Sequence, residues 1–300
     1  MQAATSSSIP AAETAATRRT LWAATVRTKS LAERLLAARA GGFTAQSAFP
    51  LDVKSWLSQG QTLAALRDQA RAGGAPITTL DPLTQWLPRW QPPASMSGPD
   101  RAFVEFDQPT FFGYATELGV EKVSVIESFG TRYELAELVA AFQRICDAAQ
   151  ERNLLVQVEF MPFGSIPDLA TAWEIVRRAG RDNGGLVFDT WHYYRGRPDN
   201  ALLRQVPGEK VFSVQLADAT SALQGGSLFA DLMHYRRVPG EGDFPLAEVV
   251  TLLHRSGGLA DVGVEVFSDV LDGLAAEAAG ERAGAGMRQL LATATAAPRR

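Results

Sequence analysis

The pattern of apolar and polar positions alternates between short runs typical of β-strands and longer segments with the period of an α-helix. The short runs are rich in β-branched and aromatic residues and recur eight times. The predicted strands are 21–25, 44–48, 77–80, 122–126, 155–160, 186–188, 211–216 and 262–266. Such alternation predicts a parallel α/β sheet, and eight strands fit a single closed (β/α)₈ TIM barrel.

Helical periodicity is clearest in four of the segments between the predicted strands. These predicted helices are 31–40, 134–151, 169–179 and 246–256, three of which end at glycine, as helices often do. The segment 84–97, with clustered tryptophan and proline residues, fits neither element. We expect it to form a long loop over the barrel mouth.

The two ends of the chain lack hydrophobic periodicity. Residues 1–19 are rich in Ala, Ser and Thr, which predicts a disordered leader, and 292–300 predicts a flexible tail. The intervening 20–291 then form one barrel domain, a common length for this architecture.

Polar residues occupy matching positions near the ends of four successive predicted strands. Because strand side chains alternate between two faces, Glu159 lies opposite the apolar residues of strand 155–160. The same alternation opposes Asp189, Gln215 and Glu265 to the apolar residues of the next three strands. Each strand therefore points one polar group inward near its C-terminal end, where barrel enzymes assemble their active sites.

Three inward carboxylates and an amide need a compensating partner. Mutual repulsion and desolvation would otherwise destabilise the fold, and a divalent metal removes that cost. An all-oxygen ligand set suits Mn²⁺ or Mg²⁺ better than softer ions. The chain has three histidines, too few for a multi-zinc cluster. The sequence therefore predicts one divalent ion.

Composition and net charge indicate what kind of molecule the protein binds. The 300 residues carry a formal net charge of −4, which provides no basic surface for nucleic acid. No apolar run approaches the ~18–20 residues that span a bilayer, and the N-terminus lacks a secretory signal pattern. We expect a cytoplasmic protein with a small-molecule partner; a homo-oligomer is compatible with the sequence. The single cysteine, Cys146, follows the apolar period of its helix and is predicted to lie in the core.

Five segments, in this order along the chain, resemble the xylose-isomerase-like barrel superfamily, with the resemblance covering about 21–291. They are Val158-Glu-Phe160, Phe188-Asp-Thr-Trp-His192, Val214-Gln-Leu-Ala-Asp218, Arg236-Arg-Val-Pro-Gly-Glu-Gly242 and Gly263-Val-Glu265. The superfamily includes sugar-phosphate isomerases and epimerases, ketose 3-epimerases, inosose and dehydroshikimate dehydratases, and type IV apurinic endonucleases. The endonuclease branch needs several zinc ions and a basic surface, which this chain lacks.

The resemblance implies that the four inward residues bind the metal and that His192 and Arg236 contact substrate. Many isomerase and epimerase members have histidine where this chain has Gln215, whereas glutamine occurs in some dehydratase-like members. Strand 44–48 also lacks a carboxylate that is common in relatives. These departures leave the substrate open.

The chemistry that follows is proton transfer next to a carbonyl. A metal chelating a carbonyl and its neighbouring hydroxyl would stabilise an enediolate, with Glu159 and Glu265 as base and acid. The predicted activity is an isomerase or epimerase acting on a sugar, polyol or cyclitol-like hydroxy-ketone. A metal-dependent dehydratase of the dehydroshikimate or inosose type is one alternative. A non-catalytic barrel that binds a metabolite or supports a partner is the other.

Four further residues have both a functional and a structural interpretation. His192 would polarise a substrate oxygen or brace Asp189. Arg236 would anchor a substrate oxyanion or remain an exposed loop charge. Glu127 would contact substrate or form a loop salt bridge. Trp86 would line the site or only pack beneath the loops.

Overall fold

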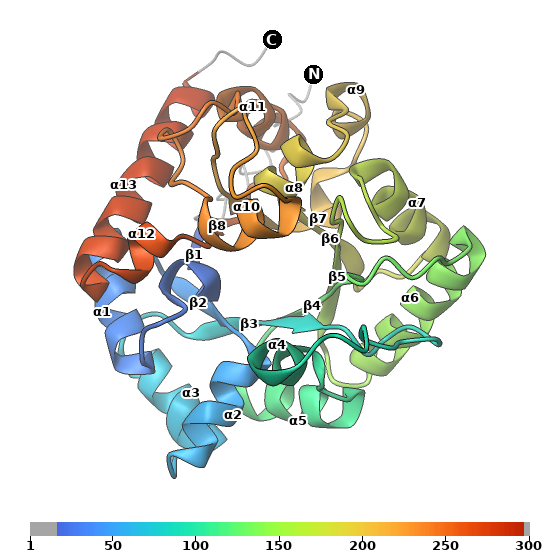
Figure 1. Cartoon of the computed structure of the whole chain (residues 1–300), viewed down its shortest axis with the longest axis horizontal. Coiled ribbons are helices and arrows are strands. Elements are labelled where there is room, and N and C mark those ends of the chain that lie inside the picture. Colours follow the sequence, from blue (N-terminus) through green and yellow to red (C-terminus); the bar gives the residue numbers. More distant parts are fainter. Residues whose placement is uncertain (1–16, 297–300) are drawn as a thin grey trace, which may run out of the picture.

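The computed structural model describes residues 17–296, so most of the predicted leader and the residues 297–300 lie outside the described part of the chain. Eight parallel strands form a closed barrel in chain order, and β8 pairs with β1 (Figure 1). The strands are β1 Arg18–Leu21, β2 Ala45–Ala48, β3 Ile77–Leu83, β4 Lys122–Val125, β5 Leu155–Glu159, β6 Gly184–Asp189, β7 Val211–Leu216 and β8 Asp261–Val264. The predicted (β/α)₈ barrel is confirmed.

Helices surround this barrel (Figure 1). The α-helices are α1 Leu31–Gly41, α2 Pro50–Ser58, α3 Leu63–Ala72, α4 Gly98–Val104, α5 Gln108–Leu118, α6 Leu135–Gln150, α7 Leu169–Ala179, α8 Thr190–Arg195, α9 Asn200–Leu203, α10 Leu228–His234, α11 Leu246–Ser256, α12 Asp269–Asp272 and α13 Ala276–Thr295. Short 3₁₀ helices occupy Ala23–Val26 and Gly208–Lys210. The four predicted helices agree with α1, α6, α7 and α11 to within one residue.

Two predicted boundaries were wrong. The first strand is β1, which starts at Arg18 inside the predicted leader, and part of the predicted 21–25 run is a 3₁₀ helix. An apolar pattern missed β1 because its inward residue is polar: Thr20 donates a hydrogen bond to Asp261 across 2.6 Å. Near the C-terminus, α13 continues to Thr295, beyond the predicted end at 291. Ala294, in the last turn of α13, is buried. The packing of this residue stabilises the turn, although the sequence there shows no strong apolar period.

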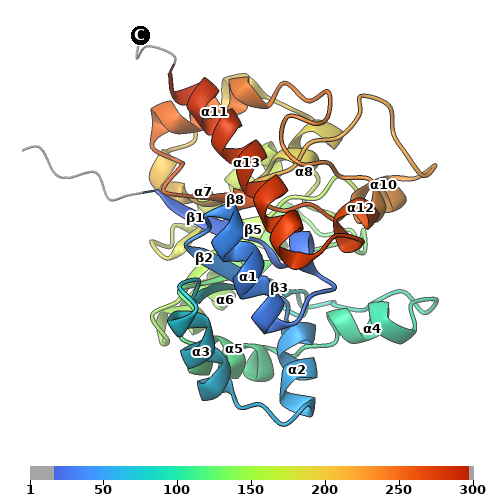
Figure 2. The same cartoon turned by 90° about the vertical axis from the view of Figure 1, so that its left-hand side faces the viewer.

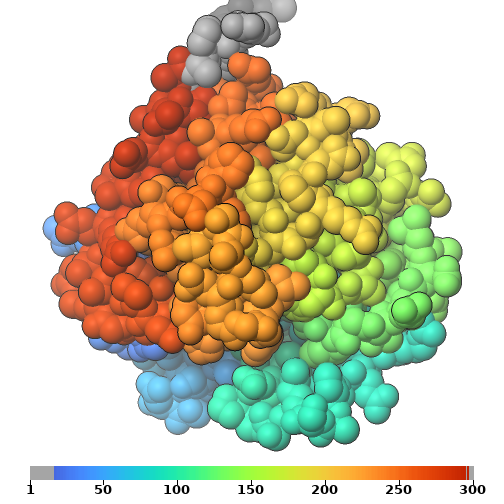
Figure 3. Space-filling view, turned by 45° about the horizontal axis from the view of Figure 1, so that its top comes forward, coloured from blue at the N-terminus to red at the C-terminus, as the bar shows by residue number. Residues whose placement is uncertain are grey.

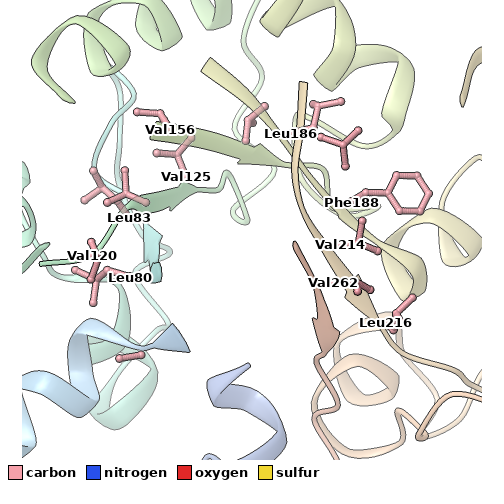
Figure 4. Packing of buried hydrophobic residues seen from close by; sticks show 14 of the residues in the cluster. Leu80, Leu83, Val120, Val125, Val156, Leu186, Phe188, Val214, Leu216 and Val262 are labelled. Atoms are coloured by element: carbon pink, nitrogen blue, oxygen red, sulfur yellow. The ribbon is translucent and has the colours of Figure 1, made fainter. Parts of the chain in front are cut away.

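The main hydrophobic core lies between the strands and the helices. Figure 4 shows Leu186, Phe188 and Val214 on the helix side of their strands, and all three are fully buried. Burial of each such side chain contributes about 1.5–3 kcal/mol. Cys146, on α6, belongs to the same cluster, as predicted. This layer holds the strands in register and therefore fixes which residues point inward.

The barrel interior is polar at its N-terminal end. The Lys122 ammonium, at the start of β4, contacts the Asp261 carboxylate at the start of β8 and hydrogen-bonds the Ser213 hydroxyl at 2.8 Å. Burial lowers the pKa of Lys122, and the Asp261 charge partly offsets that shift. At Gly263 a Cβ would lie 1.8 Å from the carbonyl oxygen of Thr20, so β1 and β8 could not approach as closely with any other residue.

The opposite end of the barrel carries the longer connections. Segment 84–97 is a loop, as predicted, and it leads into α4. Helices α4 and α10 lie on opposite sides of the opening in Figure 1 and at the same end of the barrel in Figure 2. In the space-filling view, the orange segment that includes α10 stands forward (Figure 3). None of the helices within 17–296 is both long and apolar enough to cross a membrane.

Candidate metal and catalytic site

The four polar residues predicted to point inward do lie together at the C-terminal ends of neighbouring strands. Glu159 ends β5, Asp189 ends β6, Gln215 is the penultimate residue of β7, and Glu265 follows β8. Asp189 is directly opposite Gln215 in the β6–β7 register, and Gln215 is opposite Gly263. All four side chains are buried. Alternation along the strands was therefore sufficient to predict their position.

A cavity of about 470 Å³ opens above these residues. Glu159 and Glu265 line it together with His192 and Arg236, whereas Asp189 and Gln215 lie outside its lining and have no exposed surface. The volume lies in the range of about 300–1,000 Å³ typical of small-molecule sites.

Arg236 lies among the carboxylates instead of on an exposed loop. One terminal nitrogen donates to the Asp189 carboxylate at 2.7 Å and lies 3.4 Å from the nearer Glu265 carboxylate oxygen. The guanidinium also lies over the Trp191 ring, 4.9 Å from its centroid. The loop-charge alternative is wrong. The guanidinium lines the cavity but is committed to two buried carboxylates, so its first role is charge compensation.

His192 joins this cluster from the first turn of α8. Its backbone N–H donates to the Asp189 carboxylate at 2.8 Å, which caps the helix. Its Nε2 lies 3.1 Å from a Glu159 carboxylate oxygen, and its Nδ1 is buried without a hydrogen-bond partner among the described residues. Potential ligand atoms of Glu159, Asp189 and His192 lie within 4.8 Å of one another. The structure therefore adds a histidine to the candidate metal donors, which sequence alternation did not include.

Burial and mutual repulsion shift the acid–base properties of the cluster. Desolvation, together with the Asp189 charge, raises the pKa of Glu159 to about 8. Desolvation and the Glu159 charge raise the pKa of Glu265 well above its usual value. Burial alone would raise the pKa of Asp189, but the Arg236 guanidinium and the hydrogen bond from the His192 backbone N–H keep it below its usual value. Desolvation lowers the pKa of His192 to about 3, so the imidazole is neutral and able to bind a metal.

Gln215 provides the test of whether a metal fits. Both atoms of its side-chain amide are buried without a hydrogen-bond partner among the described residues. Leaving a buried polar atom unsatisfied costs about 1–3 kcal/mol, and such atoms in folded proteins call for an explanation. Gln215 lies opposite Asp189 in the β6–β7 register, and the same end of the barrel carries Glu159 and Glu265, whose pKa values are raised. A divalent ion would coordinate the amide oxygen of Gln215 and would supply positive charge to the carboxylates.

Asp81 is the site residue that the sequence interpretation missed. It lies on β3, is buried, lines the cavity, and has one carboxylate oxygen without a partner among the described residues. Burial and the Glu159 charge raise its pKa to about 8, although the Ser124 hydroxyl hydrogen-bonds it. The predicted strand stopped at Leu80, because Pro82 normally breaks a strand. Extending the strand by one residue would have placed Asp81 at the site.

Glu127 and Trp86 lie outside the lining of this cavity, and their contacts with a substrate stay predictions. The Glu127 carboxylate accepts hydrogen bonds from the backbone N–H groups of Phe129 at 2.9 Å and Ser165 at 2.6 Å, so it ties two loops together. The Trp86 indole N–H donates to the carbonyl of Ile126 at 2.8 Å. Both side chains stabilise the loops around the site, because their polar atoms form hydrogen bonds with backbone groups.

The closed barrel and its cluster of polar strand ends agree with comparison to known families. The family model for the xylose isomerase-like TIM barrel matches residues 35–292, and the chain belongs to this family. Among curated relatives, a 3-dehydroshikimate dehydratase from Pseudomonas aeruginosa is 32% identical over 161 residues, covering 53% of this chain and 25% of the relative. An inosose isomerase from Bacillus subtilis is 29% identical over 143 residues, covering 47% of this chain and 50% of the relative. The matches thus span between a quarter and a half of these relatives.

Solved structures show the same fold at low sequence identity. An IolI protein with a bound zinc atom superposes with a TM-score of 0.77 at 19% identity, covering 92% of this chain and 98% of that one. An L-ribulose 3-epimerase gives a TM-score of 0.65 at 18% identity, covering 93% and 96% of the two chains. The related enzymes are isomerases, epimerases and dehydratases.

Proposed function

We propose that this chain is a divalent-metal-dependent isomerase or epimerase acting on a sugar, polyol or cyclitol-like hydroxy-ketone. The observation that carries the proposal is the buried Gln215 amide, which has no hydrogen-bond partner within residues 17–296, at the barrel end that carries Glu159, Asp189 and Glu265. With Asp81, four carboxyl groups face one guanidinium, that of Arg236, so the site lacks positive charge. A barrel that only binds a neutral metabolite has no use for such an imbalance.

The metal ligands in this proposal are Glu159, Asp189, Gln215 and Glu265, with His192 as a further donor. Oxygen donors favour Mn²⁺ or Mg²⁺, while a histidine donor also accommodates zinc. The IolI structure contains a bound zinc atom. When bound, the ion supplies Lewis-acid polarisation of a substrate carbonyl.

Proton transfer falls to the carboxyl groups that line the cavity. Asp81 reaches it from β3, Glu159 from the end of β5 and Glu265 from the residue after β8, so the three carboxyl groups enter from different parts of the barrel. The pKa values of about 8 at Glu159 and Asp81 describe the metal-free site, where both groups hold protons at neutral pH. A bound divalent ion would favour ionisation, so that one carboxylate can remove a proton next to a carbonyl while a second carboxyl group that keeps its proton returns one.

A dehydratase is the second candidate. Gln215 favours it, because glutamine occurs at this position in some dehydratase-like members, and one relative at 32% identity is a 3-dehydroshikimate dehydratase. The same inward carboxyl groups would then remove the proton and protonate a departing hydroxyl. The two activities differ only in where the second proton goes.

The test is solvent exchange. The purified protein is incubated with Mn²⁺ in D₂O with ketoses, inososes and dehydroshikimate, and deuterium incorporation is followed by NMR. We expect deuterium at a carbon next to the carbonyl, with the labelled carbon distinguishing epimerisation, isomerisation and dehydration. Glu265→Gln should reduce exchange by at least 100-fold, because it removes an acid–base group and a metal ligand.

The matched control is Glu281→Gln, the same change at an exposed position of α13. It should exchange at the rate of the unmodified protein. If Mn²⁺ does not bind and no compound exchanges, the non-catalytic barrel is the better explanation.

A further inference from the structure

The walls of the cavity differ sharply in chemistry from its floor. The floor is formed by charged groups, among them Asp81, Glu159 and Glu265. Above it, the side chains that line the cavity are mainly aromatic and aliphatic, and they come from six different strand-to-helix connections. A site for a bare polyol would be expected to carry hydrogen-bonding groups at both levels, because every buried hydroxyl needs a partner.

The first wall is built around Phe49, which follows β2. Its ring meets the Phe103 ring of α4 edge-on, with centroids 5.1 Å apart, and stacks on Phe267 at 6.2 Å. Phe267 follows β8 and also lies beneath the Arg236 guanidinium, 5.3 Å from ring centroid to charge centre. The aromatic wall is therefore continuous with the charged floor, so both belong to a single site.

The remaining walls are apolar as well. Phe129 and Phe163 reach the cavity from the connections after β4 and β5, and Phe229 and Leu232 reach it from α10. Phe229 is 58% exposed, and an apolar group bound in the cavity would cover part of its ring.

Four polar residues also line these walls, and two of them, Arg27 and Asp52, are paired with other residues, whereas Asp100 and Ser128 are the other two. The Arg27 guanidinium hydrogen-bonds the Asp272 carboxylate at 2.6 Å, and Asp52 forms an ion pair with Arg34 at 2.7 Å. A substrate hydroxyl placed at this level would lose its water and find few partners, at a cost of about 1–3 kcal/mol.

We infer that the upper cavity is an apolar subsite, and that the substrate carries a hydrophobic group of aromatic size attached to its hydroxy-carbonyl head. The head would occupy the charged floor, and the apolar group would lie between α4 and α10. This inference rests on the proposed function for the position of the head. It adds the substrate class: an aryl- or alkyl-substituted hydroxy-ketone in place of a free sugar.

Binding to the Mn²⁺-loaded protein tests the inference. One probe is scyllo-inosose, and the others are its mono-O-benzyl ethers, with the benzyl group at each hydroxyl in turn. Calorimetry should show at least one ether binding about 10- to 100-fold more tightly than the parent ketone, the gain expected for burying one phenyl ring. Phe229→Ala and Phe103→Leu should each remove at least about fivefold of this gain.

Tyr235→Ala is the matched control. Tyr235 follows α10, is 43% exposed and does not line this cavity, so its loss should leave the gain unchanged. Because Phe229 is mostly exposed, its substitution should not endanger the fold.

Two results would overturn the inference while leaving the proposed function intact. In the first, the parent ketone exchanges deuterium but every benzyl ether binds no more tightly. In the second, sedimentation shows that Phe229→Ala dissociates an oligomer and the ethers show no gain, so that a second copy of the chain covers the aromatic walls. Failure of metal binding and of exchange with every compound would instead count against the proposed function.

Discussion

The Arg236 guanidinium donates a hydrogen bond to the Asp189 carboxylate across 2.7 Å, and neither side chain has any exposed surface. Forty-seven residues separate the two in sequence. Asp189 is the carboxylate of the cluster whose pKa is lowered, because this cation and His192 outweigh the effect of burial. The pair therefore keeps one carboxylate ionised while its neighbours retain protons.

Substitution of Arg236 should show how much the stability of the fold depends on its ion pair with Asp189. Arg236→Ala leaves Asp189 buried and unpaired, which should lower the free energy of unfolding by about 3–5 kcal/mol in urea titrations without metal. Saturating Mn²⁺ should recover part of the loss, because a bound ion again compensates the carboxylate. The neighbouring Arg237→Ala, at an exposed position, should change stability by less than about 0.5 kcal/mol. Equal stability of the two variants would show that Arg236 does not compensate the cluster.

Gln215 should contribute to metal binding and not to folding. Gln215→Leu removes two buried amide atoms that have no hydrogen-bond partner among the described residues, so we expect the metal-free protein to be as stable or slightly more stable. Calorimetric titration should show Mn²⁺ affinity reduced by at least 10-fold. Gln157→Leu is a useful comparison, because Gln157 donates to the Ser124 hydroxyl at 3.0 Å and its loss should destabilise the fold. Retained Mn²⁺ affinity in Gln215→Leu would remove Gln215 from the ligand set.

The metal-free protein should lose stability as the pH rises from about 5 to about 8. In this window the folded state keeps protons on Glu159 and Glu265, whose pKa values are raised, while the unfolded chain releases them. The free energy of unfolding then falls with pH, by at most about 1.4 kcal/mol per pH unit for each retained proton. Apparent Mn²⁺ affinity should rise over the same window, because the metal displaces those protons.

Urea midpoints at pH 5, 6.5 and 8 measure this effect. Glu265→Gln should show a shallower decline than the unmodified protein, since it lacks one of the titrating groups. Glu281→Gln should show an unchanged decline. Parallel declines in all three proteins would mean that Glu265 is not the source.

The buried pair at the other end of the barrel should affect stability alone. Lys122→Met leaves Asp261 buried with only its neighbours Thr20 and Arg18, which should cost about 3–5 kcal/mol. The double variant Lys122→Met with Asp261→Leu should recover most of that loss, as expected when both charges are replaced by apolar groups. Deuterium exchange by the folded fraction should stay within twofold of the unmodified protein, because the pair lies at the N-terminal ends of the strands. A large change in exchange would show that the two ends of the barrel are coupled.

The alternation of side chains along single strands was enough to determine much of this protein. It predicted the barrel, and it predicted that Glu159, Asp189, Gln215 and Glu265 point inward, because parity along a strand is a local property. Helix ends were equally local: the glycines after α1, α7 and α11 adopt the left-handed backbone that ends a helix. The apolar pattern did not identify β1, because its inward residue Thr20 is polar. It did not give the full length of β3, because that strand contains Pro82.

Only the tertiary structure decided which groups meet. In the folded chain Arg236 hydrogen-bonds Asp189, and the Glu127 carboxylate accepts hydrogen bonds from backbone amides. Asp81, on β3, lines the same cavity as Glu159 and Glu265. The tertiary structure also gathered apolar side chains from six separate connections above the charged floor. These contacts depend on how closed strands and their loops converge in space. The hydrophobic periodicity of a single segment cannot predict these contacts, because the contacting residues lie tens of residues apart in the sequence.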